Sequence, residues 1–135
     1  MGKLITMLVA GLLFLLSGCS NEMTGGSGSP SSSWQTITAT EAREMMAEAD
    51  SFILLDVRTE EEFRERRIYG ALLIPYNEIK SRAESELTDK NVVIFLYCRS
   101  GRRSALAAAD LATLGYMSIY DFGGIINWSY EIASD

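Results

Sequence analysis

The stretch that decides the fold is NVVIFLYCRSGRRSALAAADLATL, residues 91–114. Its first part, residues 91–97, is mostly apolar and β-branched, which is typical of a strand that is buried on both faces of a sheet. Its second part, residues 100–114, is rich in alanine and predicts a helix, and Gly115 follows where a C-terminal cap belongs. A strand that leads through a short polar turn into a helix is the unit of parallel α/β sheets.

The same alternation of short apolar runs and helical segments continues on both sides of this stretch. Strands are predicted at 34–37, 52–57, 71–74, 91–97 and 117–120, helices at 38–48, 59–66, 76–87, 100–114 and 125–132, and a turn at 123–124. Thr38 with Glu41 and Thr59 with Glu62 have the spacing of a capping box, which begins two of these helices. Strands that alternate with helices predict an α/β fold with a central, mainly parallel sheet and helices on both faces.

The composition excludes several kinds of chemistry. The chain has 135 residues, which predicts one domain, and it contains two cysteines and no histidine. Serine or cysteine nucleophiles paired with histidine, imidazole general bases and histidine-ligated zinc or haem all need the missing residue. Two cysteines cannot form a four-thiolate metal site or a disulfide framework. We therefore expect no metal and no cofactor, and chemistry that uses a single thiol, carboxylates, tyrosines or arginines.

The first 33 residues predict an export signal and a linker. Lys3 precedes an apolar stretch, 4–16, that is shorter than the roughly 20 residues of a membrane-spanning helix, although a permanent membrane anchor is the alternative. Residues 16–19, LSGC, resemble the lipobox of bacterial lipoproteins, which implies cleavage after residue 18 and a diacylglyceryl group on Cys19. Residues 20–33 are rich in Gly and Ser and predict a flexible linker. The predicted organisation is a signal peptide (1–18), a lipidated cysteine with linker (19–33) and a globular domain (34–135).

Lipidation implies a place in the cell envelope, outside the cytoplasm and anchored to a membrane. Ser20 rather than Asp after Cys19 would favour the outer membrane, if the cell has one, by resemblance to lipoprotein sorting. Without residues 1–18 the chain has 11 basic and 18 acidic residues and a net charge of −7, which argues against nucleic acid as a partner. Acylation would also use the Cys19 sulfur and leave Cys98 as the only thiol.

Cys98 ends the most central-looking strand, where parallel sheets place their ligand sites. A short polar loop leads from it into the next helix: Arg99, Ser100, Gly101, Arg102 and Arg103. Backbone N–H groups, the helix dipole and three guanidinium groups would all favour the thiolate, and such thiols ionise at roughly pH 3.5 to 7.5 instead of about 8.5. No acidic residue follows Arg99 before Asp110, so we expect unpaired arginines and an anion site. The alternative is a structural cysteine beside a solvated basic turn.

Residues 34–135 resemble the rhodanese (sulfurtransferase) family over essentially their whole length. The matching features, in chain order, are Asp56-Val57-Arg58 with Glu62-Phe63, Ile68 with Gly70-Ala71 and Ile74-Pro75, Tyr97 through Ser104, and Gly123-Gly124-Ile125 with Trp128. The chain departs from the family pattern at Arg66, Arg67 and Tyr69, where a Gly-His-Ile-Pro-like run is common, and this puts the local turn in doubt.

The resemblance implies a sulfurtransferase whose nucleophile is Cys98. The thiolate would attack the outer sulfur of a donor such as thiosulfate or a persulfide, hold it as a cysteine persulfide, and pass it to a thiol or to cyanide. The loop, 98–103, would bind an anionic donor, and another protein could supply or accept the persulfide. We expect Asp56 and Arg58 to support the site, with an ion pair between Arg58 and Glu62 beside it. Gly123, Gly124 and Trp128 are expected to shape the last turn.

Two other functions are open at this stage. A cysteine phosphatase also holds a thiolate in a loop at a helix N-terminus, but it needs arginine at position 104, where this chain has Ser104. A non-enzymatic binding or redox-sensing module could use the same fold, with Cys98 oxidised to a sulfenic acid and no second cysteine in the domain to resolve it. A transferase should gain one sulfur atom and lose it to cyanide, whereas a sensor should not turn over sulfur donors.

Overall fold

The computed structural model describes residues 34–135, so the predicted signal peptide, lipidated cysteine and linker lie outside the described residues. The elements are β1 (Trp34–Thr36), α1 (Ala39–Glu48), β2 (Ile53–Asp56), α2 (Glu60–Glu65), β3 (Arg67–Ile68), β4 (Leu72–Leu73), the 3-10 helix η1 (Tyr76–Glu78), α3 (Ile79–Glu86), β5 (Val93–Cys98), α4 (Arg102–Thr113), β6 (Ser118–Gly124), the 3-10 helix η2 (Ile125–Asn127) and β7 (Ile132–Ala133). Within this part of the chain no helix has the length and apolar character needed to cross a membrane.

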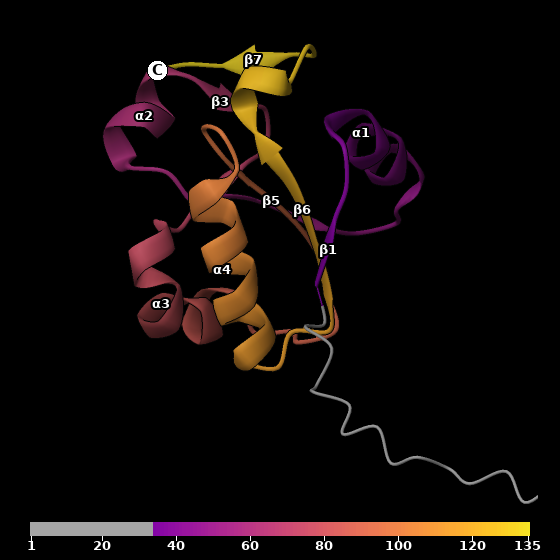
Figure 1. The fold of residues 1–135 in the computed structure, drawn as a ribbon, viewed down its shortest axis with the longest axis vertical. Coiled ribbons are helices and arrows are strands. Elements are labelled where there is room, and N and C mark those ends of the chain that lie inside the picture. The colour runs from indigo at the N-terminus through magenta and orange to yellow at the C-terminus, as the bar shows by residue number, and fades with distance from the viewer. Residues whose placement is uncertain (1–33) are drawn as a thin grey trace, which may run out of the picture.

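Five strands form one parallel sheet in the order β1-β6-β5-β2-β4. β5 lies at its centre, between β6 and β2, which explains why its sequence is the most continuously apolar in the chain. α1 lies on one side of the sheet and α3 and α4 lie on the other (Figure 1). The predicted α/β class, with a parallel sheet and helices on both faces, is therefore confirmed.

The sheet separates two hydrophobic clusters. Leu96 and Cys98 of β5 belong to the cluster on the side of α3 and α4, whereas Phe95 and Tyr97 belong to the cluster on the side of α1. This division follows from the geometry of a strand, because successive side chains point to opposite faces. The thiol therefore lies on the α4 side of the sheet.

Both predicted capping boxes are present. In the first, the backbone N–H of Glu41 donates to the Thr38 hydroxyl (3.1 Å) and the N–H of Thr38 donates to the Glu41 carboxylate (2.7 Å). In the second, the corresponding distances between Glu62 and Thr59 are 3.2 and 3.0 Å. Each box satisfies N–H groups that have no partner inside the helix, which explains why α1 and α2 begin where the sequence predicts.

The prediction of a closing helix at 125–132 is wrong. Only one 3-10 turn forms, η2, and the chain then extends into β7, which pairs antiparallel with β3. The indole N–H of Trp128 donates to the Glu131 carbonyl (3.2 Å), and Ile132 pairs with Ile68. The paired segments are about 65 positions apart in the chain, so no local sequence pattern predicts that they pair. β3 also resolves the doubt about the turn after Arg66, since Gly70 adopts the left-handed conformation there.

Candidate active site

Cys98 lies at the carboxyl end of β5, and the loop that follows turns directly into α4. Gly101 precedes the first residue of α4 with φ of +110°, a left-handed conformation that favours glycine. Gly124 packs against this loop so closely that a Cβ there would overlap the carbonyl oxygen of Arg99. The loop that begins at Cys98 is therefore shaped by two glycines, one within it and one at the end of β6.

The thiol is buried and surrounded by hydrogen-bond donors. Its sulfur accepts the backbone N–H of Gly101 at 3.0 Å and lies 3.6 Å from the hydroxyl oxygen of Ser104. Burial is the largest single influence and raises the pKa of Cys98, but hydrogen bonds from Ser104 (backbone and hydroxyl), Gly101 and Ser100 together outweigh it. The pKa of Cys98 is therefore lowered by groups that do not include a histidine.

Ser104 is a site residue that the sequence analysis did not identify. Its side chain is buried, and its hydroxyl lies within hydrogen-bond distance of the carbonyl oxygens of Gly101 (3.1 Å) and Gly123 (3.3 Å) as well as of the sulfur. It lies in the first turn of α4, where a serine side chain can point back toward the preceding loop. The signal available in the sequence was its place directly after the polar loop that follows Cys98.

The expectation of three unpaired arginines is wrong for Arg103. Its guanidinium forms two hydrogen bonds with the carboxylate of Glu62 on α2, at 2.7 and 2.8 Å. The hydrogen bond from Arg103 is the main reason why the pKa of Glu62 is lowered to about 2. Arg99 and Arg102 are exposed and form no ion pair within residues 34–135. Within the described residues, the predicted anion site therefore keeps two arginines without an ion pair instead of three.

Asp56 and Arg58 form a buried pair, and the expected ion pair between Arg58 and Glu62 is absent from the described residues. The Asp56 carboxylate accepts Nε and Nη2 of Arg58 at 2.6 to 3.2 Å and the hydroxyl of Tyr97 at 2.8 Å. Tyr97 in turn accepts the backbone N–H of Ile68 at 3.0 Å. Arg58 pairs with Asp56 and not with Glu62, because Asp56 lies only two residues away at the end of β2. Glu62 pairs with Arg103 instead.

The hydrogen-bond network of Asp56 and Arg58 is connected to Cys98 through the backbone of Tyr97. Tyr97 immediately precedes Cys98, and the two side chains lie on opposite faces of the sheet. Burial and the negative charge of Asp56 raise the pKa of Tyr97, so this hydroxyl stays protonated and donates to Asp56. The hydrogen bond between Tyr97 and Asp56 therefore links the ends of β5 and β2. Within residues 34–135 no three His, Cys, Asp or Glu side chains gather where they could hold a metal ion.

Comparisons with known proteins agree with this geometry. A family model described as the rhodanese-like domain matches residues 38–131. The chain is 35% identical over 71 residues to the thiosulfate sulfurtransferase PspE of Escherichia coli (strain K12), covering 53% of this chain and 68% of that protein. It is 39% identical over 85 residues to a sulfurtransferase of Allochromatium vinosum, covering 62% and 78%. A solved structure described as rhodanese with anions from E. coli matches with a TM-score of 0.59 and 29% identity, over 63% of this chain and 100% of that one.

Proposed function

The chain belongs to the rhodanese-like domain family, and from this premise we propose that it is a sulfurtransferase that carries sulfane sulfur as a persulfide on Cys98. The observation that carries the proposal is the buried sulfur of Cys98, which accepts the Gly101 N–H at 3.0 Å in a loop at the N-terminus of α4. Such a loop lowers the pKa of the thiol and offers further N–H groups to a second sulfur atom.

The proposed reaction has two displacement steps. In the first, the Cys98 thiolate attacks the outer sulfur of thiosulfate, a new S–S bond forms, and sulfite leaves with the electron pair of the old S–S bond. In the second, an acceptor thiolate or cyanide attacks the terminal sulfur of the persulfide, and Cys98 leaves as a thiolate. No external oxidant or proton is needed, because the charge of each step balances. The loop N–H groups stabilise both the thiolate and the terminal persulfide anion.

The charges around the loop favour an anionic donor. Arg99 and Arg102 are exposed and without ion pairs in the described part of the chain, so their guanidinium groups are available to the oxygens of thiosulfate or to a carboxylate on an organic persulfide. Arg103 is held by Glu62, and its role is to orient the start of α4. The buried hydroxyl of Ser104 stands where a cysteine phosphatase would need its arginine, which disfavours phosphate chemistry.

The first test is the intact mass of residues 34–135 before and after thiosulfate, and again after cyanide. This segment is suitable because it contains the whole sheet, and because a solved E. coli chain matches part of it over 100% of that chain's length. We expect a gain of one sulfur atom that cyanide removes and that Cys98→Ser abolishes without loss of cooperative unfolding. No adduct from thiosulfate or from a small persulfide would instead favour a binding or sensing module.

The proposed location is the cell envelope, with a lipid anchor on Cys19. The apolar stretch at 4–16 and the LSGC motif support this location. β1 begins at the end of the parallel sheet opposite the carboxyl end of β5, so a tether would join the domain at the end away from Cys98. Radiolabelled fatty acid should appear in the wild-type chain and not in Cys19→Ser, and a mature wild-type chain without label would contradict the anchor.

A further inference from the structure

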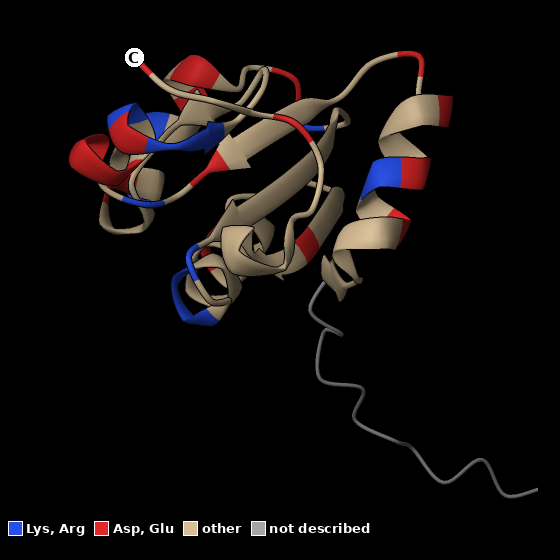
Figure 2. Cartoon of the chain, turned by 90° about the horizontal axis from the view of Figure 1, so that it is seen from above, with Lys and Arg blue, Asp and Glu red and all other residues tan. Residues whose placement is uncertain are grey.

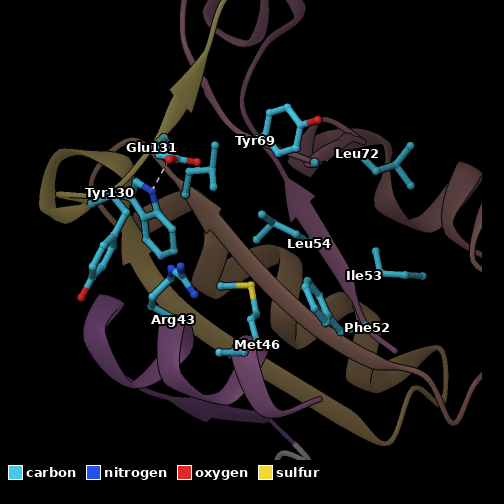
Figure 3. Close-up of a pocket in the computed structure, with 13 residues that line it drawn as sticks. Arg43, Met46, Phe52, Ile53, Leu54, Tyr69, Leu72, Tyr130 and Glu131 are labelled. Carbon is cyan, nitrogen blue, oxygen red and sulfur yellow. Dashed lines mark hydrogen bonds between the residues drawn. The ribbon is translucent and has the colours of Figure 1, made fainter. Parts of the chain in front are cut away.

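A hollow of about 770 Å³ opens on the α1 side of the sheet. Met46 of α1, Leu54 of β2, Ile68 of β3 and Trp128 contribute to its lining. It lies between α1 and the ribbon formed by β3 and β7, beside the edge of the sheet at β4 (Figure 3). The volume falls within the range of about 300–1,000 Å³ that is typical of pockets for small molecules.

The hollow is separate from the site at Cys98. Leu54 belongs to the same cluster as Phe95 and Tyr97, whereas Cys98 belongs to the cluster on the other face of the sheet. A molecule bound in the hollow therefore has the thickness of the sheet between itself and the sulfur. The sulfur-transfer chemistry described above does not use this space.

The rim of the hollow exposes large apolar side chains. The exposed fractions are 38% for Phe52, 77% for Tyr69, 41% for Leu72 and 39% for Tyr130. Single exposed apolar residues are ordinary, but several around one concave surface mark a binding site. The apolar lining calls for a ligand with an apolar body, and the aromatic rings suit a flat or extended one.

Arg43 places a positive charge at one end of the hollow. Its guanidinium carbon lies 5.6 Å from the ring centroid of Tyr130, and it forms no ion pair with any carboxylate of residues 34–135. It is the only basic residue of α1 and appears in Figure 2 as the single blue segment of the helix at the right. Arg43 and Tyr130 lie at one end of the hollow and Phe52 at the other (Figure 3).

Glu131 also lines the hollow and limits the charge of a ligand. Arg43 and Glu131 together give the lining a formal charge of zero. A multiply charged anion would therefore be repelled by Glu131, and the lining has no second cation to offset this repulsion. A cationic ligand would have to compete with Arg43 for the face of Tyr130. A ligand with an apolar body and a single negative charge can contact both Arg43 and the apolar lining.

From these observations we propose that the hollow binds a small molecule with an apolar body and one carboxylate group. The carboxylate contacts Arg43 at the end beside Tyr130, and the body lies over Leu54 and Trp128 toward Phe52. Binding at this place is independent of Cys98, because no part of the ligand crosses the sheet.

The test uses residues 34–135 and three probes of equal chain length: decanoate, decanol and decylammonium. We expect saturable binding of decanoate in equilibrium dialysis, with weaker binding of the alcohol and the amine. Arg43→Gln should weaken decanoate about three- to fivefold, as expected for an ion pair at an exposed site. Glu131→Gln should tighten it about twofold, because it removes a negative charge from the lining. The matched control is Arg64→Gln, which removes an exposed arginine from α2 and should leave the affinity for decanoate unchanged.

A second variant tests the place of the ligand. Ala47 lines the hollow from the exposed face of α1, so Ala47→Phe should block decanoate while thermal unfolding stays cooperative. Absence of saturable decanoate binding, or equal effects of Arg43→Gln and Arg64→Gln, would overturn the proposal. So would unchanged affinity in Ala47→Phe, or tighter binding of decylammonium that Glu131→Gln abolishes, since the last result assigns a cation site.

Discussion

At the scale of single residues, the reactivity of Cys98 depends on how many N–H and O–H groups point at its sulfur. Burial alone would raise the pKa of the thiol, and the donors of Ser100, Gly101 and Ser104 reverse that effect. In the proposed reaction, the donors of this loop therefore take the place that a histidine has in enzymes with a Cys-His pair. Such donors would also remain in place in the proposed persulfide.

The hydroxyl of Ser104 is expected to tune this ionisation. The Ser104 hydroxyl lies 3.6 Å from the sulfur and lowers the pKa of Cys98, so in Ser104→Ala this pKa should rise and the pH profile of alkylation by iodoacetamide should move to higher pH. Loss of a hydrogen bond to a charged group corresponds to a rate about tenfold lower near neutral pH. The matched control is Ser100→Ala, which keeps the backbone N–H that Ser100 contributes. A profile that does not move in Ser104→Ala would mean that the hydroxyl only supports the loop.

The two unpaired arginines should select the donor by charge. Arg99→Ala and Arg102→Ala should each raise the KM for thiosulfate about three- to tenfold, with a smaller change for a neutral organic donor of sulfane sulfur. The measurement is the steady-state rate with cyanide as acceptor for both donors. Equal losses with the charged and the neutral donor would remove the assignment of these two residues to an anion site.

At the scale of secondary-structure elements, the pair between Glu62 and Arg103 joins α2 to the first turn of α4. Both side chains are about four-fifths buried, and the two hydrogen bonds make a bidentate contact that fixes the guanidinium. The sequence correctly predicted the helix that contains Glu62 and its capping box. The predicted partner of Glu62, however, was Arg58 and not Arg103. The competing carboxylate, Asp56, lies two residues from Arg58 and is buried with it.

The pair predicts a stability that depends on pH. The folded-state pKa of Glu62 is lowered from 4.5 to about 2, so the folded state binds this proton less readily than the unfolded state. The contribution is therefore complete above pH 4.5 and is lost as the pH falls from there toward 2. Glu62→Gln should lower the free energy of unfolding by about 1–3 kcal/mol at pH 7, and the difference from wild type should vanish near pH 2.

Chemical denaturation at pH 7, 4 and 2 measures this difference. The matched control is Glu60→Gln, which breaks an exposed pair with Arg64 on the same helix and should change the free energy of unfolding by about 0.5 kcal/mol or less. A loss in Glu62→Gln that is the same at all three pH values would show that the residue acts through packing and not through its charge.

At the scale of the whole molecule, the sheet divides the protein into two faces with different chemistry. One face holds the thiol against α4, and the other holds an apolar hollow between α1 and the ribbon of β3 and β7. This ribbon forms because β7 pairs with β3. The pairing places Tyr130 and Glu131, which precede β7, in the lining of the hollow. The short strand β7 therefore completes the fold and also shapes the hollow.

Residues 34–135 should fold and react without the preceding segment. All five strands of the sheet and both hydrophobic clusters lie within this part of the chain, so it should unfold in one cooperative transition. We expect a melting temperature within about 4 °C of that of the full chain, which corresponds to about 1 kcal/mol or less for a domain of this size. Calorimetry of the two forms measures it, and a multiphasic or much lower transition would assign residues 1–33 a part in the fold.

The sequence by itself determined what is encoded in neighbouring residues: the two capping boxes, the buried strand β5, the turn into α4, and the thiol with its loop. Hydrogen bonds over three or four positions and the period of side chains along a strand carry this information. Only the tertiary structure decided that Arg103 pairs with Glu62, 41 positions away, that the end of the chain forms β7, and that a hollow lies beside α1. These features depend on distances between segments that are remote in the chain, and chain order alone does not specify those distances.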